Sequence, residues 1–205
     1  YCALHYIEAS DFNAVQLFTY MFLQLDFTHL FFNMFSLFIF GQVLERVWGG
    51  KRFLFYYIST GIGAAIVQEV VWMFTITDSL SLVDQITQQV SLTGAEALQY
   101  AQAHGMDISG FYNSHVTLGA SGAVFGVLLA FGMMFPNVPM YIMFIPVPIK
   151  AKYMVIGYGV IELFLGVGGL QQGVAHFAHL GGMLFGIIIL LVWKKKGILG
   201  GGGYY

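Results

Sequence analysis

One serine and one histidine stand at corresponding ends of two apolar segments of this chain. Ser121 is the serine of a Gly-Ala-Ser-Gly sequence, at the start of an apolar segment that continues to Phe135. His179 lies near the start of another apolar segment, which continues to Trp193. A serine is a poor nucleophile until a base removes its proton, and a histidine can do so near neutral pH. Ionisable groups at membrane depth are costly, so the pair predicts a nucleophile and its base.

The composition indicates a membrane protein. Of the 205 residues, 58% are hydrophobic and only 9% are charged, whereas about a quarter are charged in soluble domains. A helix needs roughly 20 apolar residues to cross a bilayer. Five segments of the sequence meet that requirement by our count: residues 27–44, 53–74, 116–135, 153–170 and 174–193. The sequence therefore predicts an all-α polytopic membrane protein with five spanning helices.

The positive charges set the orientation. All eight Lys and Arg residues fall in three groups, namely Arg46 with Lys51 and Arg52, Lys150 with Lys152, and Lys194 with Lys195 and Lys196. The positive-inside rule places these groups in the cytoplasm, so the first, third and fifth spans run from outside to inside. Tyr1 then lies outside, and we expect a further span upstream of it.

This topology divides the chain into parts. Residues 1–196 form the predicted membrane domain, with an outer loop over residues 1–26 and an outer insert over residues 75–115. A short helix is predicted within the insert, over residues 93–104, and residues 139–149 are predicted to be a loop at the membrane face. Residues 197–205 are rich in glycine and read as a flexible cytoplasmic tail.

Polar residues occur in the first two turns of all three spans that run inward. His29 and Asn33 are four residues apart, and so share one face of the first helix. The first turn of the third helix offers unpaired backbone N–H groups beside Ser121, which are the donors that an oxyanion needs. Glycines in the third and fifth helices would let the two backbones approach closely.

These residues also have structural interpretations. A serine at a helix start is more often a cap, and a lone histidine is as often a structural partner, but three such groups in one leaflet favour catalysis. No lysine or aspartate is placed to complete a triad, so a Ser–His dyad is the sharper hypothesis.

These motifs resemble those of the rhomboid family of intramembrane serine proteases. Three match in order: His29-x-x-x-Asn33, Gly119-Ala120-Ser121-Gly122 and Ala178-His179-x-x-Gly182-x-x-x-Gly186. The resemblance implies a six-helix core, of which this chain has five. It also implies that Ser121 is the nucleophile, that His179 is the base, and that His29, Asn33 and the backbone N–H of Ser121 hold the oxyanion. Phe125 is expected to lie against the catalytic histidine.

The resemblance further implies a function and a location. The expected substrates are transmembrane segments of other membrane proteins, and the protein is expected to be an integral multi-pass membrane protein, in the inner (plasma) membrane if it is bacterial. The lipid bilayer is the other expected partner, and no cofactor, metal or nucleic acid is expected. The family's Trp-Arg pair in the first outer loop stands here as Val15-Gln16. His176 is predicted to be a cap or a substrate contact rather than the base.

Two other functions compete with proteolysis. A catalytically silent rhomboid-like protein would bind transmembrane segments without cutting them, but this chain keeps the serine and histidine of the motifs together with His29 and Asn33. A transporter would use an acid inside a span, and Glu162 is its best evidence. The simpler interpretation of Glu162 is a hydrogen-bonded or protonated packing residue.

Overall fold

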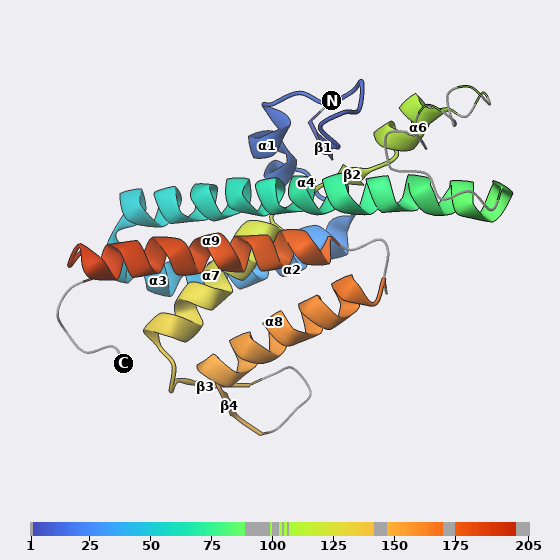
Figure 1. Cartoon of the computed structure of the whole chain (residues 1–205). Helices are drawn as coiled ribbons and strands as arrows, with labels where there is room; N and C mark the ends of the chain where they lie inside the picture. Colours follow the sequence, from blue (N-terminus) through green and yellow to red (C-terminus); the bar gives the residue numbers. More distant parts are fainter. Residues whose placement is uncertain are drawn as a thin grey trace.

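The protein is a bundle of helices with two short antiparallel strand pairs at its periphery (Figure 1). The computed structural model describes residues 2–88, 99, 103, 105, 107–141, 147–169 and 175–199. The helices are α1 (Gln16–Thr19), η1 (Tyr20–Phe22), α2 (Phe27–Ser36), η2 (Leu37–Gly41), α3 (Gln42–Trp48), α4 (Gly50–Gln88), α6 (Ile108–Asn113), α7 (Ser121–Met134), α8 (Ala151–Val167) and α9 (His176–Lys195). The strands are β1 (Leu4–His5), β2 (Val116–Thr117), β3 (Pro139–Met140) and β4 (Ile149–Lys150).

Three helices of the described chain are long and apolar enough to cross a membrane. They are Phe27–Trp48, Gly50–Ile76 and His176–Lys195. The first joins α2, the π-helical turn η2 and α3 into one rod, which begins where the Asp26 carboxylate accepts the backbone N–H of His29 at 2.7 Å. The apolar helix α7 is shorter, at 14 residues, and α8 has 17 residues. The predicted number of five spans therefore stays a prediction, whereas the all-helical membrane architecture is confirmed.

The second helix is longer than its predicted bounds of residues 53–74. It begins at Gly50 and continues to Gln88, well into the predicted outer insert. Residues 75–88 contain neither glycine nor proline, so nothing in this stretch ends the helix. The short helix predicted over residues 93–104 falls almost wholly outside the described residues.

The third helix begins later than predicted, at Ser121 rather than at residue 116. Val116 and Thr117 form a strand, β2, that pairs antiparallel with β1. Gly119 follows with φ of 129°, a backbone conformation that a helix cannot contain and that side chains disfavour. These two features place Ser121 in the first turn of α7, next to the end of a strand.

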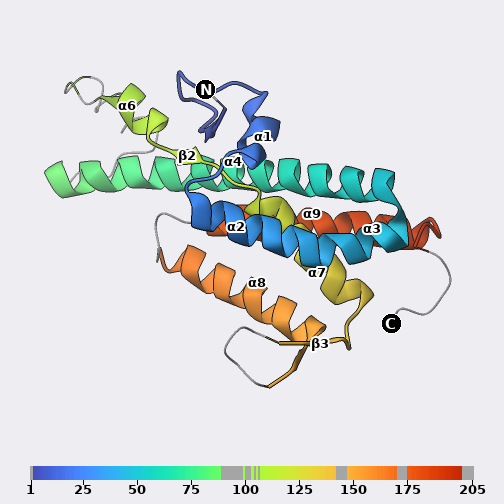
Figure 2. The same cartoon turned by 180° about the vertical axis from the view of Figure 1, so that it is seen from behind.

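Helix α9 packs on three other helices, α4, α7 and α8. It lies along α4 and crosses α7, as both views show (Figures 1 and 2). A Cβ atom on Gly182 would collide with the carbonyl oxygen of Gly122, so the backbones of α9 and α7 are in direct contact. Such close approach of small residues is a main source of helix association within membranes. The predicted packing of the third span on the fifth is found here.

We expect Gly182→Ala to lower the free energy of unfolding by about 1–3 kcal/mol, because the added methyl must push two backbones apart. Gly157→Ala is the matched control, since no heavy atom lies within 4 Å of a Cβ built at Gly157 on α8. It should leave stability unchanged or raise it slightly. Unfolding in detergent measures both variants, and equal stability of the two would contradict the close contact.

Candidate active site

The first turns of α2, α7 and α9 meet around one cavity of about 620 Å³. His29, Ser121 and His179 line it, one from each helix, and α4 contributes Gln68 and Trp72. The loop and strand before α7 form another part of its wall. The three polar groups that the sequence placed in one leaflet are therefore brought together around a shared space.

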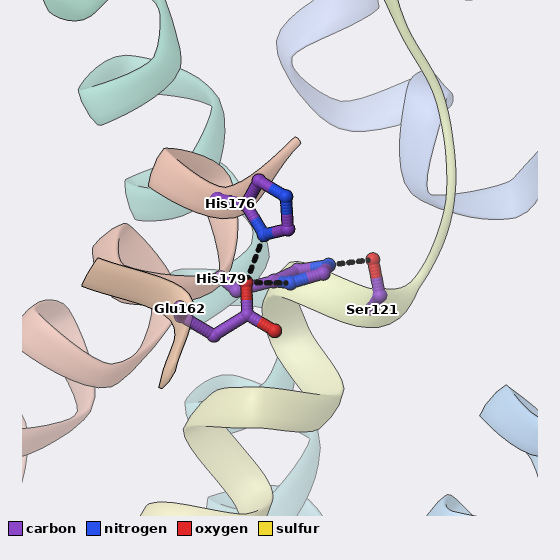
Figure 3. Close-up of polar contacts among 4 residues, drawn as sticks. All are labelled: Ser121, Glu162, His176 and His179. Atoms are coloured by element: carbon purple, nitrogen blue, oxygen red, sulfur yellow. Dashed lines mark hydrogen bonds and ion pairs between the residues drawn. The ribbon is translucent and has the colours of Figure 1, made fainter. Parts of the chain in front are cut away.

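Ser121 and His179 are in hydrogen-bond contact. The Nε2 atom of His179 lies 2.8 Å from the hydroxyl oxygen of Ser121 (Figure 3). The imidazole also stacks on the ring of Phe125, with centroids 4.3 Å apart and planes 3° from parallel. Phe125 is one turn after Ser121 on the same helix, so α7 supplies both the hydroxyl and the surface that fixes the plane of the histidine ring. His179 is buried, at 7% exposure.

His29 presents a hydrogen to the same space. Its Nδ1 atom accepts the backbone N–H of Leu25 at 3.2 Å, so the neutral ring carries its proton on Nε2. A Cβ atom built on Gly119 would lie 2.9 Å from that Nε2 and 3.6 Å from the Ser121 hydroxyl oxygen. The absence of a side chain at residue 119 therefore lets the His29 ring lie close to the serine.

Asn33 is placed differently. It is buried on the same helix, and its amide nitrogen donates to Gln24 at 2.7 Å. It is not among the residues that line the cavity. The Asn33 amide has a second hydrogen, so its bond to Gln24 does not prevent it from donating to an oxyanion. That role stays a prediction.

Glu162 and His176 complete a cluster that the sequence did not reveal. Glu162 points inward from α8, and its Oε2 atom accepts the Nδ1 hydrogen of His176 at 2.7 Å. The same oxygen lies 2.9 Å from Nδ1 of His179, which is within the distance of an ion pair (Figure 3). The geometry of this contact is not that of a standard hydrogen bond. His176 therefore binds the carboxylate, where a cap or a substrate contact was predicted. The available signal was an acid inside an apolar segment, which demands a partner.

The cluster of Glu162, His176 and His179 could also be considered as a set of metal ligands. One oxygen and two nitrogens lie within 4.8 Å of one another. Tetrahedral zinc would hold such atoms about 3.3 Å apart, given bonds of about 2.0 Å. The observed separations of 2.7 and 2.9 Å from the carboxylate oxygen are those of shared protons. The arrangement fits proton chemistry better than zinc coordination.

Comparison with known proteins gives two findings. The family model described as "Rhomboid domain" matches residues 11–196. A curated protein from Providencia stuartii, named rhomboid protease AarA, is 28% identical over 185 residues, which cover 84% of this chain and 53% of that protein. The chain thus spans about half the length of this curated relative. No solved structure matches the chain significantly.

The geometry predicts that a fluorophosphonate probe labels Ser121 in detergent, because His179 is placed to take its proton. Ser121→Ala should remove the label, and His179→Ala should slow labelling by about 100- to 10,000-fold. Ser114 is the matched control, since it lines the same cavity but donates its hydroxyl to the carbonyl oxygen of Phe111 at 2.7 Å. Labelling that survives in Ser121→Ala but is lost in Ser114→Ala would contradict this assignment.

Proposed function

Because this chain belongs to the rhomboid family, we propose that it is an intramembrane serine endopeptidase that cleaves transmembrane segments of other membrane proteins. Ser121 is the proposed nucleophile and His179 the proposed general base. The observation that carries the proposal is the 2.8 Å contact between the serine hydroxyl and Nε2 of His179, at the wall of a cavity within an integral membrane protein.

The first half of the proposed reaction has two proton transfers through one nitrogen. As the oxygen of Ser121 attacks the substrate carbonyl carbon, its proton moves to Nε2 of His179. The same nitrogen then returns the proton to the leaving amine, which gives an acyl-enzyme. Water entering the cavity repeats the sequence and releases the new carboxyl end. The Phe125 ring keeps the imidazole in one plane during both transfers.

The negative charge on the carbonyl oxygen needs fixed donors. Nε2–H of His29 and the backbone N–H of Ser121 are the proposed donors, and Asn33 is a proposed further contributor. Donors that are already oriented in a site of low dielectric are worth more than in water, because they need no rearrangement when charge develops. A neutral histidine whose Nδ1 accepts a backbone hydrogen is suited to this role.

The proposed substrate is a membrane helix. Its carbonyl groups are occupied in its own hydrogen bonds, so the segment must unwind locally before Ser121 can attack. Residues with poor helix propensity near the cleavage point should assist this unwinding. The family resemblance adds a preference for small residues at that point. Glu162, the main evidence for the transporter alternative, contacts two histidines and is not among the residues that line the cavity.

We expect Ser121→Ala and His179→Ala each to abolish cleavage of a transmembrane substrate in detergent or vesicles, while both variants remain folded. The two residues act as one unit, so the double variant should be no worse than either single variant. Turnover of the substrate and a melting curve are measured on each. A folded Ser121→Ala that still cleaves would end the protease proposal.

We expect His29→Ala to reduce kcat by about 100- to 1,000-fold, because it removes one oxyanion donor and leaves the backbone N–H of Ser121. Residual labelling of Ser121 by a covalent probe should remain. Asn33→Ala is measured in parallel. A fall in kcat would assign Asn33 to the oxyanion, whereas a lower melting temperature alone would assign it to the bond with Gln24. Unchanged turnover per folded molecule in His29→Ala would remove His29 from the mechanism.

A further inference from the structure

The Glu162 carboxylate lies on the far side of the His179 ring from the serine (Figure 3). Its Oε2 atom is 2.9 Å from Nδ1 of His179, while Nε2 of that ring faces Ser121 at 2.8 Å. We infer that Glu162 is a positioning residue, which holds His179 in the tautomer and orientation needed by the base, and that His176 holds Glu162 in place. This inference rests on the proposed function.

The tautomer of His179 decides whether it can act. To accept the Ser121 proton, Nε2 must carry a lone pair, so the proton of the neutral ring must be on Nδ1. That nitrogen is buried and makes no hydrogen bond of standard geometry with any described residue. A buried N–H without an acceptor is unfavourable, and the ring would favour the other tautomer. The carboxylate of Glu162 is an acceptor within reach of this N–H, at 2.9 Å. A small rotation of the carboxylate or of the ring would bring the two into hydrogen-bond alignment.

His176 explains how the carboxylate stays in reach. It lies one turn before His179 on α9, so both rings face α8, and its Nδ1 bonds the same oxygen of Glu162 at 2.7 Å. Both histidines and the acid are buried. A buried carboxylate needs hydrogen-bond donors, and the bond to His176 alone would be sufficient to tie α8 to α9. The further contact of Glu162 is with His179, the proposed base itself.

The carboxylate also favours the charged state of the reaction. When His179 takes the serine proton it becomes an imidazolium, with Nδ1–H directed at Glu162. Opposite charges in contact attract strongly in a site of low dielectric. In serine proteases of other folds, exchanging the corresponding carboxylate for an amide lowers kcat by about 10,000-fold, because the histidine adopts the wrong tautomer.

A structural tie between helices is the competing explanation, and Glu162→Gln separates the two. Glutamine has the same shape and can still bond His176, so a tie would survive. It has no charge, and its amide can donate to Nδ1 of His179 and so stabilise the wrong tautomer. Glu69→Gln is the matched control, because Glu69 is also buried but accepts the backbone N–H of Ile7 at 2.9 Å, in a separate contact on α4.

The experiment measures kcat, KM and melting temperature for wild type, Glu162→Gln, Glu69→Gln and Ser121→Ala. We expect Glu162→Gln to lose about 100- to 10,000-fold in kcat with little change in KM or melting temperature. Glu69→Gln should keep the wild-type kcat per folded molecule. Wild-type kcat in Glu162→Gln, or a loss that only follows the folded fraction, would overturn the inference and leave the protease proposal standing. Equal cleavage by wild type and Ser121→Ala would instead overturn the protease proposal, and this inference with it.

A second variant decides the matter if Glu162→Gln does not fold. The double variant Glu162→Leu with His176→Leu replaces the buried polar pair by apolar groups, an exchange that is often neutral for stability. It leaves Ser121, His179 and Phe125 unchanged. The inference expects a similar loss in kcat and in the rate of fluorophosphonate labelling, and wild-type values of both would overturn it.

Discussion

The direct contact between the backbones of α7 and α9 determines the geometry of the site. Gly122 follows Ser121, and Gly182 comes one turn after His179, so the point of closest approach is beside these two side chains. Because no side chain lies between the two glycines, the short side chain of Ser121 comes within 2.8 Å of the His179 ring. Apolar side chains gain little by leaving lipid for protein, so close packing of this kind is what holds such helices together. The contact between these two helices thus also sets the distance between Ser121 and His179, across which the proposed proton transfer would occur.

A second constraint is that buried polar groups must find partners where water is scarce. Ser121, His179, Glu162 and His176 satisfy one another in a chain that passes from α7 to α9, across to α8 and back to α9. His29 is oriented by a backbone N–H of the turn before its own helix. The contacts among Ser121, His179, Glu162 and His176 join separate helices, so these polar groups contribute to the tertiary structure as well as to the proposed chemistry.

The sequence predicted the membrane architecture and the meeting of Ser121 with His179, because both follow from apolar length and from small residues at helical spacing. It placed the start of α7 too early, because Val116 and Leu118 are as apolar as the helix that follows. The strand there exists by pairing with residues more than 100 positions earlier, such as Leu4 with Thr117. The sequence-based interpretation of Glu162 as a packing residue missed its histidine partners, because they lie far from it along the chain. Its contacts with two histidines on another helix are tertiary and leave no periodic signal along the chain.

The arrangement around Glu162 suits the proposed base, which becomes charged and then neutral again in each half of the reaction. If His179 were its sole partner, the carboxylate would lose a donor whenever that ring shifted toward the serine or the leaving group. His176 bonds the same oxygen and takes no part in the proposed proton transfers, so it keeps the carboxylate still while its neighbour alternates between neutral and charged forms. Helix α8 packs on α7 and α9, and its outward face carries exposed apolar side chains such as Ile156 and Phe164. Glu162 thus faces the protein while the opposite face of α8 can face lipid. The carboxylate charge is therefore in position before the proposed reaction begins, which is the condition for electrostatic preorganisation.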